Sequence, residues 1–99
     1  MPSYILSYRS TSRYDTSPET RADWRTFFAG LGDSLLELGQ PVATATTVGD
    51  CDAGSTRLGG YSIIQANDLD AAAAIAKASP VVQRGGGVEI GELRPVQPE

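Results

Sequence analysis

Few residues in this chain could carry acid–base chemistry, because the sequence has no histidine and a single cysteine. Histidine is the commonest general base and a frequent zinc ligand, so its absence excludes two common kinds of catalytic centre. Carboxylates and tyrosines remain as proton carriers. Glu89 alternates with Val88 and Ile90, and a buried carboxylate in such a segment suits general-base work; a solvated glutamate at an edge is the alternative. Tyr61 is the second candidate for a catalytic residue.

The loop around Cys51 combines groups that can bind metals. Asp50 and Asp52 flank the thiol in a turn-rich segment. A structural zinc site needs about four ligands, usually cysteine or histidine, and the sequence shows no further ligands beside these three. We therefore predict a solvated loop, no metal site and no cofactor.

Candidate binding residues alternate along a predicted strand at residues 58–66. Tyr61, Ile63 and Gln65 share one face of that strand, and smaller residues share the other. The small face suits helix packing, so we expect the first face to line a cleft. Tyr8 lies on one face of the predicted first strand, and the sequence leaves open whether the two faces coincide. Ordinary core packing is the alternative for all of these residues.

Three arginines, Arg9, Arg57 and Arg84, fall at the ends of predicted elements. If they converge, they could bind a carboxylate or a phosphate through paired hydrogen bonds, although scattered surface arginines are more frequent. Trp24 begins the apolar stripe of a predicted helix, and we assign it to a core or subunit contact rather than to ligand stacking. The predicted ligand-binding residues are Tyr8, Arg9, Arg57, Tyr61 and Gln65.

Glycines mark two further places. Gly85, Gly86 and Gly87 could hold an anion with backbone amides, but phosphate loops usually lead into a helix and this one leads into a strand, so a turn is favoured. Gly30 and Gly32 interrupt a predicted helix at a cost of about 1 kcal/mol each. We attribute them to close packing of the helix on a sheet, with space for a ligand or a partner backbone as the alternative.

The pattern of apolar residues predicts six elements. Ser17 caps a helix that begins at Pro18 and carries apolar residues at helical spacing as far as Leu38, where Gly39 stops it. Residues 9–16 are predicted as a loop. Predicted strands cover residues 3–8, 42–48, 58–66 and 88–93, a second helix covers 69–78, and 94–99 form a tail. The order strand, helix, strand, strand, helix, strand is that of the ferredoxin-like βαββαβ unit, an α+β fold.

Length and charge narrow the classes of function. A chain of 99 residues suits one domain, assigned to residues 1–99, with a modest core and no deep cavity inside a single chain. Two helices on one face of four strands leave the other face open, which favours a homodimer. A net charge of −4 without a basic run argues against a nucleic-acid partner. We expect no membrane span or signal peptide, and a single cysteine suits the reducing cytoplasm.

Three segments carry a family resemblance: residues 24–41, LGGYSII followed by NDLDAA at 58–72, and GGVEI at 86–90. They resemble the YCII-related family of small bacterial proteins, which includes the DGPF group. The resemblance implies a dimeric α+β barrel, and for some members a histidine–aspartate pair in the cleft. This chain has Val81 where that histidine is expected after a proline, and its loop reads DAGS in place of DGPF. The resemblance therefore assigns no histidine–aspartate pair to this chain.

Functions of different classes stay open at this point. We favour a dimeric protein that binds a small, mostly apolar molecule in a cleft between subunits without catalysis. The first alternative is a cofactor-free enzyme that uses tyrosine, glutamate or aspartate for proton transfer in the same cleft. The second is a protein-interaction module that uses an exposed sheet edge. The sequence identifies neither the ligand nor the pathway, and it assigns no role to Cys51.

Overall fold

The computed structural model describes residues 1–11, 17–51 and 54–96. The strands are β1 (Ser3–Ser10), β2 (Leu35–Glu37), β3 (Arg57–Gln65) and β4 (Gly87–Leu93). The helices are α1 (Pro18–Leu31), α2 (Leu69–Lys77) and the short α3 (Pro80–Gln83), and one 3-10 turn, η1 (Gly32–Ser34), follows α1. The four strands and the two longer helices follow the predicted order, and α3 is an additional short helix between α2 and β4.

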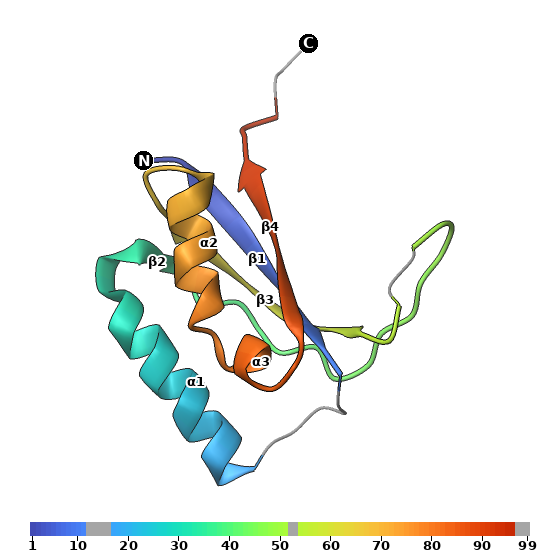
Figure 1. Cartoon of the computed structure of the whole chain (residues 1–99). Helices are drawn as coiled ribbons and strands as arrows, with labels where there is room; N and C mark the ends of the chain where they lie inside the picture. Colours follow the sequence, from blue (N-terminus) through green and yellow to red (C-terminus); the bar gives the residue numbers. More distant parts are fainter. Residues whose placement is uncertain (12–16, 52–53, 97–99) are drawn as a thin grey trace.

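One four-stranded antiparallel sheet, with strand order β2-β3-β1-β4, organises the fold. This order is the one expected for the ferredoxin-like arrangement, so the predicted fold class is confirmed. Figure 1 shows α2 lying along one face of the sheet, while α1 stands to one side of it. The backbone of α1 comes closest to α3 and η1 rather than to the strands.

The core lies between the sheet and α2. Alternation along β1 places Tyr4, Leu6 and Tyr8 on the helix-covered face, each less than 5% exposed. Ile64 of β3 is fully buried beside them. The helices complete the core with three smaller side chains, those of Ala72, Ala76 and Val81. These small residues on α2 and α3 allow the helical layer to approach the strands closely.

The prediction for the second strand was wrong. The helix predicted to reach Leu38 ends at Leu31, because Gly32 follows with a φ of 53°, a left-handed conformation that helical residues do not adopt. The chain then pairs at once with β3, Leu35 lying opposite Ile64. Residues 42–48, predicted as that strand, form no strand in the described structure.

A short extended segment, residues 38–42, continues along β3 beyond β2. Ser62 Oγ donates a 2.7 Å hydrogen bond to the Leu38 carbonyl, and the Val42 amide donates to the Gly59 carbonyl at 3.0 Å. Gly39 has a φ of 74°, and a Cβ there would collide with the Tyr61 carbonyl. Glycine is therefore required where this segment runs beside β3.

The other face of the sheet carries no helix in the described part of the chain. Ile5, Tyr61, Ile63 and Gln65 lie on this face and are half-buried, and Glu89 is exposed there. This arrangement agrees with the predicted open face. No helix among the described residues is long and apolar enough to cross a bilayer.

Candidate functional site

A cavity of about 450 Å³ lies between α1 and the helix-covered face of the sheet. Its walls come from α1, from the ends of β1 and β3, from segment 38–41, and from the turn that follows α3. Cavities of this volume accept small organic molecules. The cavity is open to solvent on one side, because α1 stands away from the sheet.

The α1 wall of the cavity is aromatic. Trp24 and Phe28 lie one turn apart on α1, and their rings stack with centroids 5.5 Å apart. Trp24 also meets Tyr8 of β1 edge to face at 4.8 Å. The start of α1 is fixed by Ser17, whose Oγ accepts a 3.3 Å hydrogen bond from the Thr20 amide.

The cavity collects positive charge in a chain whose net charge is −4. Four of the eight basic residues line it: Arg21, Arg25, Arg57 and Arg84. No aspartate or glutamate lines it within residues 1–11, 17–51 and 54–96. The local field therefore favours an anion or an electron-rich ring.

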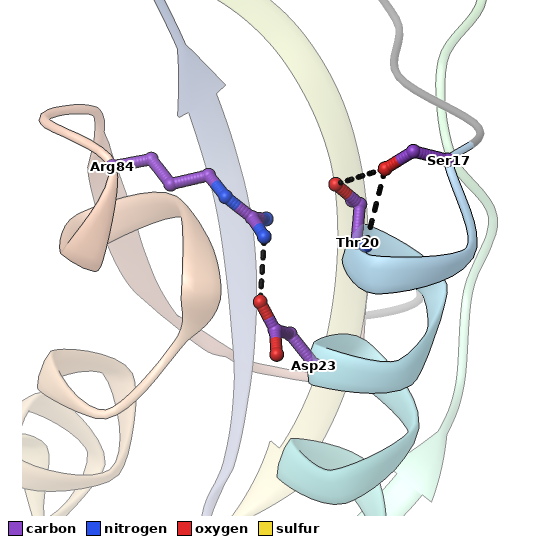
Figure 2. Close-up of polar contacts among 4 residues, drawn as sticks. All are labelled: Ser17, Thr20, Asp23 and Arg84. Carbon is purple, nitrogen blue, oxygen red and sulfur yellow. Dashed lines mark hydrogen bonds and ion pairs between the residues drawn. The ribbon is translucent and has the colours of Figure 1, made fainter.

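Two of these arginines are already held by the protein. Arg57 Nη2 donates hydrogen bonds of 3.1 Å to the carbonyls of Val42 and Ala43. Arg84 Nη2 pairs with Asp23 Oδ2 at 2.6 Å and so joins the turn after α3 to α1. Figure 2 shows this bridge beside the Ser17–Thr20 cap. Both arginines thus brace the cavity walls.

The other two arginines make no hydrogen bond or ion pair with any described residue. Arg21 and Arg25 are exposed and sit one turn apart on α1. Like charges at this spacing repel each other by a few tenths of a kcal/mol. A bound anion would remove that repulsion, so the pair is suited to receive one.

The Tyr8 hydroxyl is buried without a hydrogen-bond partner among the described residues. Ser62 Oγ lies near it but donates to Leu38 instead. Burial raises the pKa of the Tyr8 phenol above its ordinary value. Tyr8 is therefore neutral at physiological pH and is suited to donate a hydrogen bond.

The structure brings together three of the five predicted ligand-binding residues. Tyr8, Arg57 and Tyr61 line the cavity, although the Tyr61 side chain alternates toward the other face of the sheet. Arg9 and Gln65 are not among its lining residues. Arg9 Nε donates to Thr56 Oγ1 at 3.3 Å, and Gln65 Nε2 donates to the Asp33 carbonyl at 2.9 Å.

Glu89 lies on the open face of the sheet, opposite Ser7 of β1, and is exposed. It therefore lacks the burial that general-base work would require, and it is on the opposite side of the sheet from the cavity.

The sequence also left open whether Tyr8 and Tyr61 share a face. They do not, because Tyr8 lies under the helices and the Tyr61 side chain does not.

Two glycine interpretations are resolved by the structure. The Gly85 and Gly86 amides donate to the Val82 and Val81 carbonyls at 3.1 and 2.8 Å, so they form a turn and leave these amides unavailable to an anion. A Cβ added at Gly30 would meet nothing within 4 Å, and the same holds at Gly32. The attribution of those two glycines to close packing was wrong.

The loop around Cys51 shows no metal centre within the described ranges. Cys51 is exposed, and its thiol donates to the Val48 carbonyl at 3.4 Å. Asp52, one of the three candidate ligands, lies outside the described residues.

Sequence reasoning did not single out Arg21, Arg25 and Phe28. The signal was present, because Arg21, Trp24, Arg25 and Phe28 follow each other at i, i+3, i+4 and i+7. This spacing places two cations and two aromatic rings on one helical face. The pattern was interpreted only as the apolar stripe of an amphipathic helix.

Comparisons with known proteins agree with this fold. The sequence model of the YCII-related domain matches residues 1–97. The chain is similar in structure to 5-chloro-2-hydroxyhydroquinone dehydrochlorinase (TftG) from Burkholderia phenoliruptrix AC1100 in complex with 2,5-dihydroxybenzoquinone, with a TM-score of 0.64 and 15% sequence identity over 95% of this chain and 94% of that chain. At this identity the likeness shows the fold alone. No curated protein sequence matches the chain.

Proposed function

This chain belongs to the YCII-related family, and we propose that it binds a small, planar aromatic molecule in the cavity between α1 and the sheet. The observation that carries the proposal is the aromatic wall, in which Trp24 and Phe28 face the cavity beside Tyr8. Aromatic side chains favour offset-stacked or edge-to-face contact with a bound ring. Binding without chemistry is the first candidate, because no carboxylate or cysteine among the described residues lines the cavity.

Catalysis on an oxygenated ring is the second candidate, and one observation favours it. The neutral Tyr8 phenol is buried and has no hydrogen-bond partner among the described residues, so it could donate a hydrogen bond to an oxygen that gains negative charge during a reaction. The likeness to a dehydrochlorinase bound to a dihydroxybenzoquinone is consistent with this chemistry on the same fold. In such a reaction Tyr8 would act as a hydrogen-bond donor rather than as a base, because its phenol is protonated.

We also propose that the open face of the sheet pairs with a second copy of the chain. Ile5 and Ile63 lie opposite each other on that face, and both are half-buried with no helix of the described chain over them. A second sheet would cover them, as the family resemblance implies. Analytical ultracentrifugation of Ile63→Glu against the parent chain tests the pairing: a monomer is expected for the variant only.

The free, exposed Cys51 fits a reducing compartment, so the cytoplasm is the proposed location.

The binding proposal is tested through Trp24, the single tryptophan of the chain. Titration with simple substituted benzenes should change its fluorescence in a saturable way, because the indole forms the cavity wall. Phe28→Ala should weaken that binding, since it removes the ring stacked on Trp24. Ile63→Ala is the matched control, because it truncates a half-buried apolar side chain on the opposite face of the sheet. Equal weakening in both variants would contradict the cavity as the site.

A further inference from the structure

The positively charged arginines and the buried Tyr8 hydroxyl define the ligand of the cavity more closely than the cavity volume does. Resting on the proposed function, we infer that the ligand is an aromatic carboxylate that also carries a ring oxygen. Its carboxylate binds between Arg21 and Arg25, and its ring oxygen accepts a hydrogen bond from Tyr8. The ring lies against Trp24 and Phe28.

The carboxylate is assigned to α1 because, of the four lining arginines, Arg21 and Arg25 are the two without a hydrogen bond or ion pair to any residue that the structure describes. Arg57 and Arg84 already hold backbone carbonyls and Asp23. The two uncommitted guanidinium groups lie one turn apart, and a carboxylate between them accepts charge-assisted hydrogen bonds from both. The repulsion between two neighbouring cations on one helix is relieved at the same time.

The ring oxygen is assigned to Tyr8 because its hydroxyl is the buried side-chain polar atom that finds no partner in the described part of the chain. Tyr8 is 4% exposed and lines the cavity. A buried donor without a partner lowers stability, and an acceptor supplied by a ligand restores the missing hydrogen bond. Because burial raises the pKa of this phenol, it stays protonated and donates.

Burial also fixes the direction of the ligand. Arg21 and Arg25 are exposed, whereas Tyr8 is enclosed under the helices. Desolvating a carboxylate costs far more than desolvating a neutral oxygen. The charged group therefore stays at the hydrated mouth of the cavity, and the neutral oxygen enters first.

The inference is tested with four probes of matched size: para-hydroxybenzoate, benzoate, para-hydroxybenzamide and para-hydroxybenzylamine. Trp24 fluorescence and calorimetry give the affinity of each for the intact protein. We expect para-hydroxybenzoate to bind best. The amide should bind about tenfold or more weakly, because it loses the charge-assisted hydrogen bonds, and the cationic amine should bind weakest.

Two variants assign those differences to residues. In the double variant Arg21→Gln with Arg25→Gln, the preference for the carboxylate over the amide should fall toward unity. Arg94→Gln is its control, because Arg94 is exposed outside the cavity. In Tyr8→Phe, the preference for para-hydroxybenzoate over benzoate should disappear, whereas Tyr4→Phe, a buried tyrosine outside the cavity, should retain it.

The outcomes separate this inference from the proposal on which it rests. If the neutral amide binds as well as the carboxylate, or if the preference survives in the double arginine variant, the ligand class is wrong while the cavity remains a binding site. If none of the four probes binds at millimolar concentration, the cavity proposal fails and the ligand class fails with it. Circular dichroism of each variant confirms that a lost preference reflects the site rather than unfolding.

Discussion

Trp24 of α1 and Tyr8 of β1 meet edge to face, with ring centroids 4.8 Å apart and planes inclined by 64°. This contact joins a helix whose backbone stays away from the strands to β1, an inner strand of the sheet. It forms one corner of the cavity, so the residue that holds α1 in place also builds the candidate site. Stability and binding are therefore coupled at this pair.

The first prediction concerns Trp24 as a structural contact. Trp24→Ala should lower the free energy of unfolding by about 2 kcal/mol, less than for a fully buried tryptophan, because the side chain is half-buried. Trp24→Phe should lose much less, since a ring still reaches Tyr8 and Phe28. Urea denaturation followed by circular dichroism measures both. A loss within error of zero for Trp24→Ala would mean that this contact does not hold α1.

The second prediction is that Tyr8→Phe stabilises the free protein. The removed hydroxyl is buried and has no partner among the described residues, so the substitution should raise the free energy of unfolding by about 1 kcal/mol, while it weakens the binding of a ligand with a ring oxygen. The opposite signs of the two effects are the signature of a binding residue. Thermal denaturation and Trp24 fluorescence measure them. A destabilised Tyr8→Phe would show that the hydroxyl has a partner after all.

The third prediction is a loss of stability in alkaline solution. Burial raises the pKa of Tyr8 in the folded chain above 10.0, the ordinary value expected in the unfolded chain. The folded state then holds the proton more tightly than the unfolded state. The free energy of unfolding is therefore constant below the unfolded pKa and falls as the pH rises through the higher folded pKa. Burial raises the pKa of Tyr4 as well, with smaller contributions from Glu92 and Asp68.

Urea midpoints measured from about pH 8 to about pH 11 test this dependence. The midpoint should decline above about pH 10 in the parent chain, and Tyr8→Phe should flatten part of the decline. Ultraviolet difference spectra of tyrosinate formation report the ionisation itself. A midpoint that falls equally in the variant would remove Tyr8 as a cause.

The fourth prediction concerns the Asp23–Arg84 bridge. Both side chains are about half exposed, at 58% and 41%, so Asp23→Asn should cost about 1 kcal/mol or less and the cost should shrink in high salt. The same substitution frees Arg84 at the cavity wall, so it should tighten the binding of an aromatic carboxylate. Glu92→Gln, which breaks the ion pair with Arg94 outside the cavity, is the control. Weaker binding in Asp23→Asn would oppose the assignment of an anionic ligand.

The fifth prediction compares two neighbouring glycines. A Cβ at Gly86 would collide with the Arg9 carbonyl and approach Val81 Cγ2 within 2.7 Å, whereas one at Gly87 would meet nothing within 4 Å. Gly86→Ala should therefore destabilise the protein by roughly 1–3 kcal/mol, as overpacking does, and Gly87→Ala should cost much less. Thermal denaturation of the pair decides the matter. Equal losses would show that the wall between Gly86 and β1 can relax.

Much of the architecture could be predicted from the sequence, because helix caps and strand alternation favour the same elements that tertiary packing stabilises. Ser17 and Pro18 predict the start of α1, and Asp68 caps α2, its side chain accepting a 2.8 Å hydrogen bond from the Ala71 amide. Alternation in β3 predicted its two faces. The family resemblance over nearly the whole chain agreed with the fold.

The second strand was missed because tertiary pairing overrode local preference. Leu35 and Leu38 continue the helical spacing of α1, and residues 42–48 are rich in valine and threonine, which favour strands. Gly32, with its positive φ, ends the helix before Leu35. β2 then begins at Leu35 and pairs with the edge of β3 that residues 42–48 were predicted to occupy. The glycine was visible in the sequence, but its φ was not.

The candidate site was predictable only in part, because it depends on the distance between two elements. Tyr8 and Arg57 were identified from tyrosine and arginine placement, and they line the cavity. Arg21 and Arg25 belong to the site because α1 stands away from the sheet, with the helical face that carries Trp24 and Phe28 turned toward the cavity. The space between a helix and a sheet is a property of side-chain packing across the whole fold, and no local pattern encodes it.

The central claim is that the ligand binds on the helix-covered side of the sheet. Nuclear magnetic resonance of isotope-labelled protein during titration with para-hydroxybenzoate tests it most directly. The account predicts shifts at the Trp24 indole, at the Gly60 and Gly86 amides and along the first two turns of α1, with little change at Ile63 and Glu89. Shifts confined to Ile63, Gln65 and Glu89 would contradict it, because they would place the site on the open face of the sheet.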